Sequence, residues 1–170
     1  MNQRKRNVAK AVVAVALLLV AGFLTMVLRD LLSMRNPENV LPKMEVWHTT
    51  RQQRERLGDH YTLRDAYNWQ FLFGGPVQGG GLDLEAWREI QPADVEPNTR
   101  LELTFSFGPK WARVFMTEGN SGHFVEQNPS GGTYTYAAPS EQGVYTYRVE
   151  ANFGTNKDVV YYFRVSIPDW

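Results

Sequence analysis

The chain has 170 residues, no cysteine, and 18 basic residues (Lys and Arg) that balance 18 acidic ones, so its formal net charge is zero. This neutrality averages two unlike ends, because only 13 basic residues follow Arg29 while all 18 acids do, which gives that part a net charge of about −5. Without cysteine the chain has no disulfides and no cysteine nucleophile, and without a basic face on its acidic part we expect no nucleic-acid partner.

The first 32 residues carry the pattern of a membrane segment. A basic tip holds four cations and no acid, and an uninterrupted apolar run of 18 residues follows from Ala11 to Leu28. As a helix this run is about 27 Å long, close to the roughly 30 Å hydrocarbon core of a bilayer, and Leu31 and Leu32 can lengthen it. We therefore predict a basic cytoplasmic tail over residues 1–10 and a transmembrane signal anchor over residues 11–32, whose partner is the lipid bilayer.

The charge bias across this run predicts a single-pass orientation. Basic residues between Arg4 and Lys10 precede the run, whereas Arg29 and Asp30 just after it cancel each other. Under the positive-inside rule the N-terminus lies in the cytoplasm, and the residues from about 33 onward lie outside the cell membrane.

A cleaved signal peptide is the alternative interpretation, since Val20-Ala21-Gly22 contains small residues suited to a signal peptidase. The apolar run continues to Leu28, however, and is longer than the usual cleaved segment of about 7 to 15 residues, so we favour an anchor. A lipobox would need cysteine where the chain has Phe23. Whether the segment is ever cleaved stays open.

The exported part lacks two marks of eukaryotic cell-surface domains. It has no disulfides, and none of its asparagines begins an N-glycosylation sequon, since Asn128 is followed by Pro129. Both absences favour the envelope of a Gram-positive bacterium.

Residues 33–66 read as a juxtamembrane spacer with a short strand and a short helix. Pro37 and Pro42 disfavour helical conformation in the residues before them. Residues 44–49 form a candidate first strand. Residues 50–57 begin like a capping box and stop at Gly58, but they have no apolar face, so we predict a short solvated helix or a loop there.

Residues 67–170 carry the pattern of an all-β domain. Runs of alternating apolar and polar residues recur at about ten-residue spacing with Gly- and Pro-rich turns between them, which predicts an antiparallel immunoglobulin-like β-sandwich of about seven strands. The closeness of the second and third runs suggests a hairpin between them. The expected strands are 67–71, 101–107, 111–117, 123–127, 133–137, 144–153 and 158–167, with a short helix over 84–90.

A motif before the sixth strand sharpens this prediction. Glu141-x-Gly143-x-Tyr145-x-Tyr147 is similar to the immunoglobulin-type entry in which a tyrosine hydroxyl bonds to the backbone upstream, which makes Tyr145 a candidate tyrosine corner. Tyr147 stands where cysteine is usual, and Trp111 is the candidate core partner that packs against it. The predicted inner faces contain Leu101, Leu103, Phe105, Phe107, Tyr145, Tyr147, Val149, Ala151, Val159, Tyr161, Phe163, Val165 and Ile167.

The stretch from 67 to 167 resembles the exported domain of uncharacterised membrane-anchored proteins and lipoproteins from Bacillus-like bacteria. The matching motifs are Tyr67-x-Trp69, Val95-x-Pro97 before Leu101-x-Leu103-x-Phe105, and Ala138-Pro139-Ser140-Glu141 continuing through Gly143-x-Tyr145 to Ala151. The resemblance implies an extracytoplasmic β domain and carries over no catalytic residue. Phe23 stands where the lipoprotein members have the lipidated cysteine.

Aromatic residues outside the predicted core are the candidate contacts with a partner protein or a wall glycan: Trp47, Trp69, Trp87 and Trp170. His48, His60 and His123 lack a second ligand at zinc-binding spacing, and no serine nucleophile motif is present, so we assign no metal site, no cofactor and no catalytic residue.

The favoured function is a non-enzymatic, membrane-tethered binding module of the cell envelope. The alternative is a wall glycan hydrolase that uses acids such as Asp83, Glu85 or Glu89.

Overall fold

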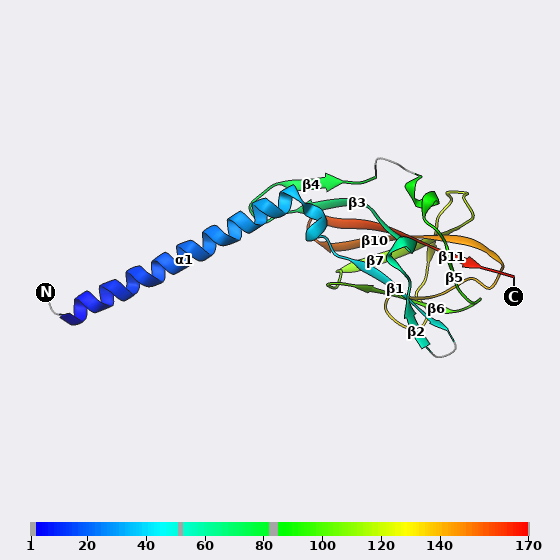
Figure 1. The fold of residues 1–170 in the computed structure, drawn as a ribbon, viewed down its shortest axis with the longest axis horizontal. Coiled ribbons are helices and arrows are strands. Elements are labelled where there is room, and N and C mark those ends of the chain that lie inside the picture. The colour runs from blue at the N-terminus through cyan, green and yellow to red at the C-terminus, as the bar shows by residue number, and fades with distance from the viewer. Residues whose placement is uncertain (1–2, 51–52, 82–84, 170) are drawn as a thin grey trace. The chain divides into compact units, whose positions relative to one another are not determined.

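The computed structural model describes residues 3–50, 53–81 and 85–169 (Figure 1). The chain separates into two compact units. One contains Met1–Val40 and Phe71–Gly75, and the other contains Leu41–Gln70 and Pro76–Trp170. We describe each by itself and call the second the β unit.

The first unit is built on one long helix, α1 (Gln3–Arg35), followed by a short 3-10 turn, η1 (Pro37–Asn39). Its segment from Asn7 to Arg35 is long and apolar enough to cross a membrane, as the apolar run predicts. Within this unit the loop 71–75 packs on the helix. The backbone N–H of Phe73 donates to Asp30 Oδ2 over 2.7 Å, and the Phe73 ring meets Phe23 edge-on with centroids 5.4 Å apart.

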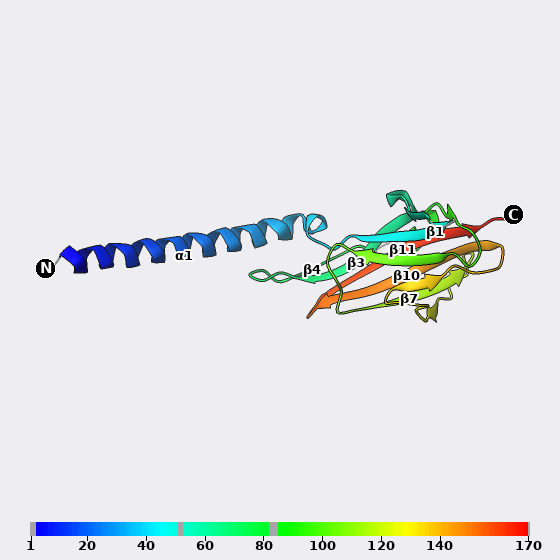
Figure 2. The ribbon, with the colours of Figure 1, turned by 90° about the horizontal axis from the view of Figure 1, so that it is seen from below.

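The β unit consists of two sheets. A four-stranded sheet has the order β2-β1-β6-β9, and a seven-stranded sheet has the order β4-β3-β11-β10-β7-β8 with β5 parallel to β11. Figure 2 shows β3, β11, β10 and β7 side by side across the larger sheet. The strands are β1 (Met44–Thr50), β2 (Gln53–Arg56), β3 (Thr62–Gln70), β4 (Pro76–Gly79), β5 (Ala93–Asp94), β6 (Arg100–Phe105), β7 (Trp111–Glu118), β8 (Val125–Gln127), β9 (Thr135–Ala137), β10 (Gly143–Gly154) and β11 (Lys157–Ile167), with 3-10 turns η2 (Asp59–Tyr61) and η3 (Ala86–Glu89).

The alternating pattern of β10 and β11 determines the centre of the larger sheet. The two strands pair along their whole length, with Tyr147 opposite Phe163 and Val149 opposite Tyr161. Every second residue is buried because one face of the hairpin turns inward. A two-residue turn, Thr155-Asn156, closes the hairpin, and Asn156 has a φ of 51°. The prediction of these two strands and their inward residues is confirmed.

The sandwich begins earlier and has more strands than the sequence predicts. The β unit starts at Leu41 rather than residue 67, because β1 pairs with β6 and β2 pairs with β1. Residues 53–56 form a strand, whereas the sequence predicts a short solvated helix or a loop over 50–57, and residues 51–52 lie outside the described part. All four residues of β2 are exposed, which is tolerated at a charged sheet edge.

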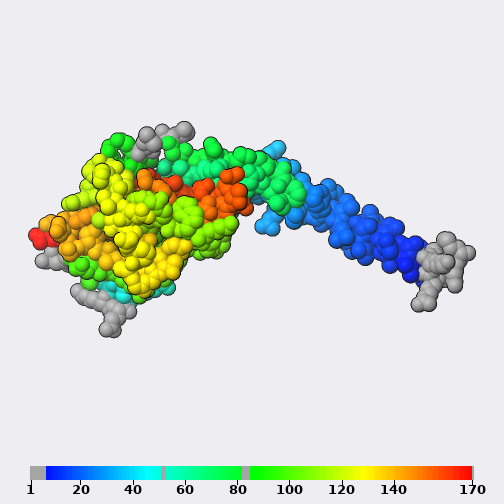
Figure 3. All heavy atoms as spheres, turned by 180° about the vertical axis from the view of Figure 1, so that it is seen from behind, coloured from blue at the N-terminus to red at the C-terminus, as the bar shows by residue number. Residues whose placement is uncertain are grey.

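The predicted hairpin between the second and third runs is also wrong. β6 belongs to the smaller sheet, whereas β7 pairs with β10 in the larger one, so residues 106–110 carry the chain from one sheet to the other. Period-two alternation shows which face of a strand is buried and does not show which strand it pairs with. The segment between β7 and β9, drawn in yellow in Figure 3, covers much of the β unit on that side.

Trp111 does not pack against Tyr147. Its side chain is 46% exposed, since Val114 faces the core and the period of two turns Trp111 to the outer face. Phe107 is 45% exposed because β6 has already ended at Phe105. The ring that packs on Tyr147 is Phe163, stacked at 4.5 Å with an interplanar angle of 1°.

Tyr145 has the geometry that its motif predicts. Its ring is buried, and its hydroxyl donates to the carbonyl oxygen of Glu141 over 3.0 Å. Tyr147 differs, because its buried hydroxyl has no hydrogen-bond partner among the described residues. Burial also raises the pKa of Tyr147, so its hydroxyl stays protonated.

These two tyrosines should respond oppositely to loss of the hydroxyl. Tyr145→Phe removes a made hydrogen bond and should lower the free energy of unfolding by about 1 kcal/mol. Tyr147→Phe removes a buried, unpaired polar atom and should leave stability unchanged or raise it. Urea denaturation of the full chain in micelles measures both, and a larger loss in Tyr147→Phe than in Tyr145→Phe would contradict this view of the core.

Substitutions at three glycines can distinguish the cost of backbone strain from the cost of steric overlap. Gly80 has a φ of 71°, and a Cβ there would lie 1.3 Å from the backbone oxygen of Asp65. Gly119 has a φ of 56° in open space, and Gly108 has open space without a positive φ. We expect Gly108→Ala to be neutral, Gly119→Ala to cost about 1 kcal/mol, and Gly80→Ala to cost clearly more. Melting temperatures of the three variants test this order.

Candidate functional site

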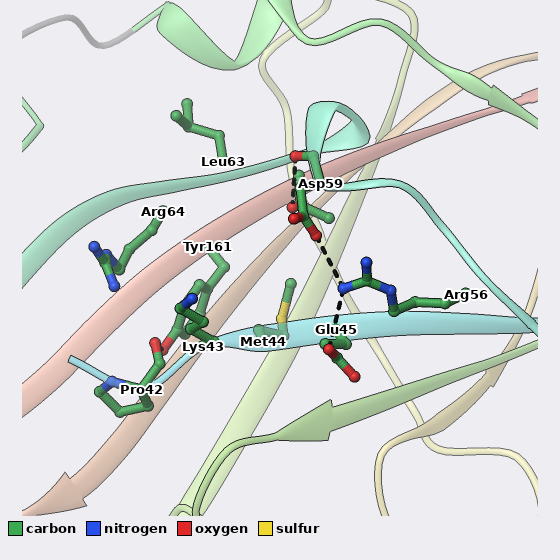
Figure 4. Close-up of a pocket in the computed structure, with 10 residues that line it drawn as sticks. Pro42, Lys43, Met44, Glu45, Arg56, Asp59, Leu63, Arg64 and Tyr161 are labelled. Carbon is green, nitrogen blue, oxygen red and sulfur yellow. Dashed lines mark hydrogen bonds and ion pairs between the residues drawn. The ribbon is translucent and has the colours of Figure 1, made fainter. Parts of the chain in front are cut away.

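A pocket of about 260 Å³ opens beside the start of β1 (Figure 4). Its walls come from segments far apart in the sequence: the residues leading into β1, the end of β2, the turn η2, the start of β3 and the middle of β11. The lining residues are Pro42, Lys43, Met44, Glu45, Arg56, Asp59, Thr62, Leu63, Arg64 and Tyr161.

Arg56 holds one wall of this pocket together. Its Nη1 donates to Glu45 Oε1 over 3.1 Å and to Asp59 Oδ1 over 3.0 Å. One guanidinium thus joins β2, β1 and η2, as the dashed lines in Figure 4 show. The two carboxylates keep oxygens that can accept further hydrogen bonds, because a carboxylate has about four acceptor sites.

Tyr161 and Pro42 form the apolar floor. The Tyr161 ring is 3% exposed, and its hydroxyl donates to the Pro42 carbonyl oxygen over 2.8 Å. This bond ties the entering chain to β11 in the larger sheet. Burial raises the pKa of the Tyr161 hydroxyl above its ordinary value of about 10.

The rim carries the positive charge of the pocket. Lys43 is exposed and makes no ion pair with any described residue, and Arg64 lines the same opening. The residues that line the pocket carry three positive charges, on Lys43, Arg56 and Arg64, and two negative charges, on Glu45 and Asp59. Donors and acceptors therefore alternate around a small cavity, which suits a ligand that both donates and accepts hydrogen bonds.

Of the tryptophans predicted as contacts, Trp47 lies nearest to this pocket in sequence but on the outer face of the smaller sheet. Its Nε1 donates to Thr104 Oγ1 over 3.0 Å, and the Arg54 guanidinium lies 4.4 Å from its ring centroid. Arg54 also pairs with Glu102 at 3.2 Å. One face of the Trp47 ring is thus already covered by a cation, and the ring is half-buried.

Trp69 and Trp87 are not available as surface contacts. They are 6% and 4% exposed, because Trp69 packs between Phe107 and Phe153 while Trp87 stacks on Tyr162. Their burial does not favour the predicted contact with a ligand at the surface. Trp170 lies outside the described residues. Trp111, assigned to the core from sequence, is instead an exposed tryptophan of the β unit.

Of the acids proposed for a hydrolase, Glu85 and Glu89 do not line the pocket. Asp83 lies outside the described residues, and Glu85 pairs with Arg88 of the adjacent turn η3. Within the described ranges no three His, Asp or Glu side chains are grouped closely enough to hold a metal ion.

Sequence reasoning missed the pocket because its residues carry no local motif. Arg56 belongs to the polar segment 50–57, for which the sequence predicts a solvated helix or a loop, and Asp59 lies just beyond this segment. The signal that could have pointed to Arg56 is the alternation of charges in Gln53-Arg54-Glu55-Arg56. In a strand this alternation puts Arg54 and Arg56 on one face.

No protein-family model, curated protein or solved structure matches this chain. The resemblance to exported domains of Bacillus-like bacteria, the immunoglobulin-like assignment and the function therefore stay predictions that rest on the residues themselves.

The floor of the pocket predicts a pH dependence. Because the folded-state pKa of Tyr161 is raised, its contribution to stability is present below about pH 10, the unfolded-state value, and is lost as the pH rises above it. At pH 7, Tyr161→Phe should be less stable than the parent chain by about 1 kcal/mol through loss of the bond to Pro42. This difference in the free energy of unfolding between the two chains should narrow between pH 10 and 11.5. A gap that stays constant in urea titrations across that range would contradict the assignment.

Proposed function

We propose that the chain is a single-pass, membrane-tethered binding module on the outer side of a bacterial cell membrane, and that the pocket beside β1 binds one sugar residue of an envelope glycan. The observation that carries the proposal is the Arg56 clamp, which joins Glu45 and Asp59 from different elements at the wall of a cavity whose rim lysine has no ion pair among the described residues.

The anchor supports the location. α1 is apolar over a membrane-spanning length, and four of its six cations precede the apolar run with no acid among them, which favours a cytoplasmic N-terminus. The β unit would then face the wall.

The pocket supports the ligand class. Sugar hydroxyls donate and accept, and the wall offers carboxylate oxygens of Glu45 and Asp59 beside guanidinium and ammonium donors. The volume of about 260 Å³ is at the lower end of ligand sites and suits one ring of a polymer. The excess of one positive charge favours a sugar that bears a carboxylate or phosphate.

Titration of the full chain in nanodiscs with purified wall glycan fragments tests this function. Arg56→Gln removes the clamp and charge-assisted hydrogen bonds worth about 1.5 kcal/mol or more, so affinity should fall at least about tenfold. Lys43→Gln should weaken binding of charged fragments more than that of neutral ones.

Arg54→Gln is the matched control. It changes the same residue type on the same strand and breaks an ion pair with Glu102, but it lies outside the pocket. We expect its affinity to equal that of the parent chain, with circular dichroism confirming the fold of all variants. Equal affinities for Arg54→Gln and Arg56→Gln, or no fragment binding by the parent chain at millimolar concentration, would refute the proposal.

A further inference from the structure

The lysines of the β unit all lie at one end of the sandwich. Lys43, Lys110 and Lys157 are the only lysines after residue 10. The backbone of Lys43 exchanges hydrogen bonds with Ser106, and the Lys110 N–H donates to the Asn152 carbonyl over 2.7 Å. Lys157 stands opposite Gly154. These contacts join the start of β1, the β6–β7 connection and the β10–β11 turn.

Two large aromatic side chains are exposed at this same end. Phe107, in the β6–β7 connection, is 45% exposed, and Trp111, the first residue of β7, is 46% exposed. Behind them lies an aromatic cluster in which Phe107 meets Phe153 at 5.1 Å and Trp69 at 6.1 Å. The Lys157 ammonium lies 5.2 Å from the Trp69 ring centroid. We call Lys43, Lys110, Lys157, Phe107 and Trp111 the lysine end.

The lysines differ from the arginines of the β unit in how their charge is compensated. Five arginines form ion pairs with acids, whereas the three lysines form none with any described residue. In a part of the chain with an excess of acids, this end therefore gathers three cations that have no carboxylate partner among the described residues. Lysine beside exposed Trp and Phe is the composition found where proteins meet the headgroup region of a bilayer.

The chain enters the β unit at the lysine end. Leu41 begins the unit, Lys43 follows two residues later, and only residues 36–40 separate Leu41 from the last residue of α1. Five residues extend at most about 18 Å. A membrane surface crossed by α1 is therefore within reach of these side chains.

We propose that the lysine end binds the outer surface of the membrane, with the Lys110 and Lys157 ammonium groups on anionic lipid phosphates and with Phe107 and Trp111 among the headgroups. The proposal rests on the proposed membrane anchor but not on the glycan pocket. Each lysine near an anionic surface favours contact by roughly fivefold, so Lys110 and Lys157 together favour it by about 25-fold.

Single-cysteine labelling of the full chain tests this surface, because the chain has no cysteine of its own. Gly108→Cys places an environment-sensitive fluorophore between Phe107 and Lys110, where a side chain has open space. Ser140→Cys reports from the exposed loop before β10, at the opposite end of that strand. Leu24→Cys reports from the anchor. Each chain is reconstituted in vesicles of phosphatidylglycerol and phosphatidylcholine with a spin label on the headgroups or the acyl chains.

We expect the headgroup spin label to quench the fluorophore at 108 at least threefold more strongly than that at 140, and high salt to reduce the difference because it screens exposed charges. Lys110→Gln with Lys157→Gln should lower quenching at 108 to the level at 140. Arg54→Gln with Arg100→Gln removes the same charge elsewhere and should leave quenching at 108 unchanged.

The possible outcomes distinguish failure of the membrane anchor from failure of lipid binding by the lysine end. If the acyl-chain label fails to quench at 24, the anchor itself is refuted. If it quenches at 24 while headgroup quenching at 108 equals that at 140, the anchor stands and the lysine end does not bind lipid. Equal loss of quenching in both double variants would show a net-charge effect and would also overturn the proposal. The vesicles contain no wall polymer, so quenching at 108 reports lipid alone.

Discussion

The stack of Tyr147 on Phe163 is the contact around which the β unit is organised. These rings face each other from paired positions of β10 and β11, on the inner face of the larger sheet, where they lie 4.5 Å apart and almost fully buried. A chain without cysteine holds its sheets together without disulfides, so apolar burial carries most of the stabilisation, and aromatic rings supply the largest buried area per residue. Leu101 and Val46 of the smaller sheet are buried completely. The remaining strands pair outward from this centre, and the pocket and the lysine end are built at their margins.

Local pattern predicted the parts of the fold that depend on local physics. The apolar run predicted α1, and strict alternation predicted β10, β11 and most of their buried residues. The predictions failed where the structure depends on pairing between strands that are far apart in the sequence. Gln53–Arg56 has no apolar face, yet it forms a strand because β1 offers an open edge and ion pairs stabilise the exposed side. Trp111 faces outward because Val114 occupies the core. The pocket joins five separate segments, so no spacing rule along the chain could reveal it.

Charge is distributed in the β unit according to side-chain type. Arginine, with its planar fork of donors, is used where a carboxylate must be held in place, as Arg56 holds Glu45 and Asp59. Lysine stays unpaired among the described residues and lies at the end where the chain enters. The glycan pocket that we propose would use Arg56 as part of a fixed wall, and the lipid-binding end would use Lys110 and Lys157 as mobile charges on a surface. The weak negative charge of the rest of the domain would keep it from adhering to anionic lipid elsewhere.

We propose that one uncleaved helix holds the β unit outside the cell. Protease digestion of intact bacterial cells that express the full chain, followed by mass spectrometry of the membrane fraction, tests this arrangement. We expect peptides of the β unit to disappear while a fragment from the N-terminus to about residue 35 stays in the membrane. A chain that is protected throughout its length, or a soluble product that begins near Phe23, would contradict it.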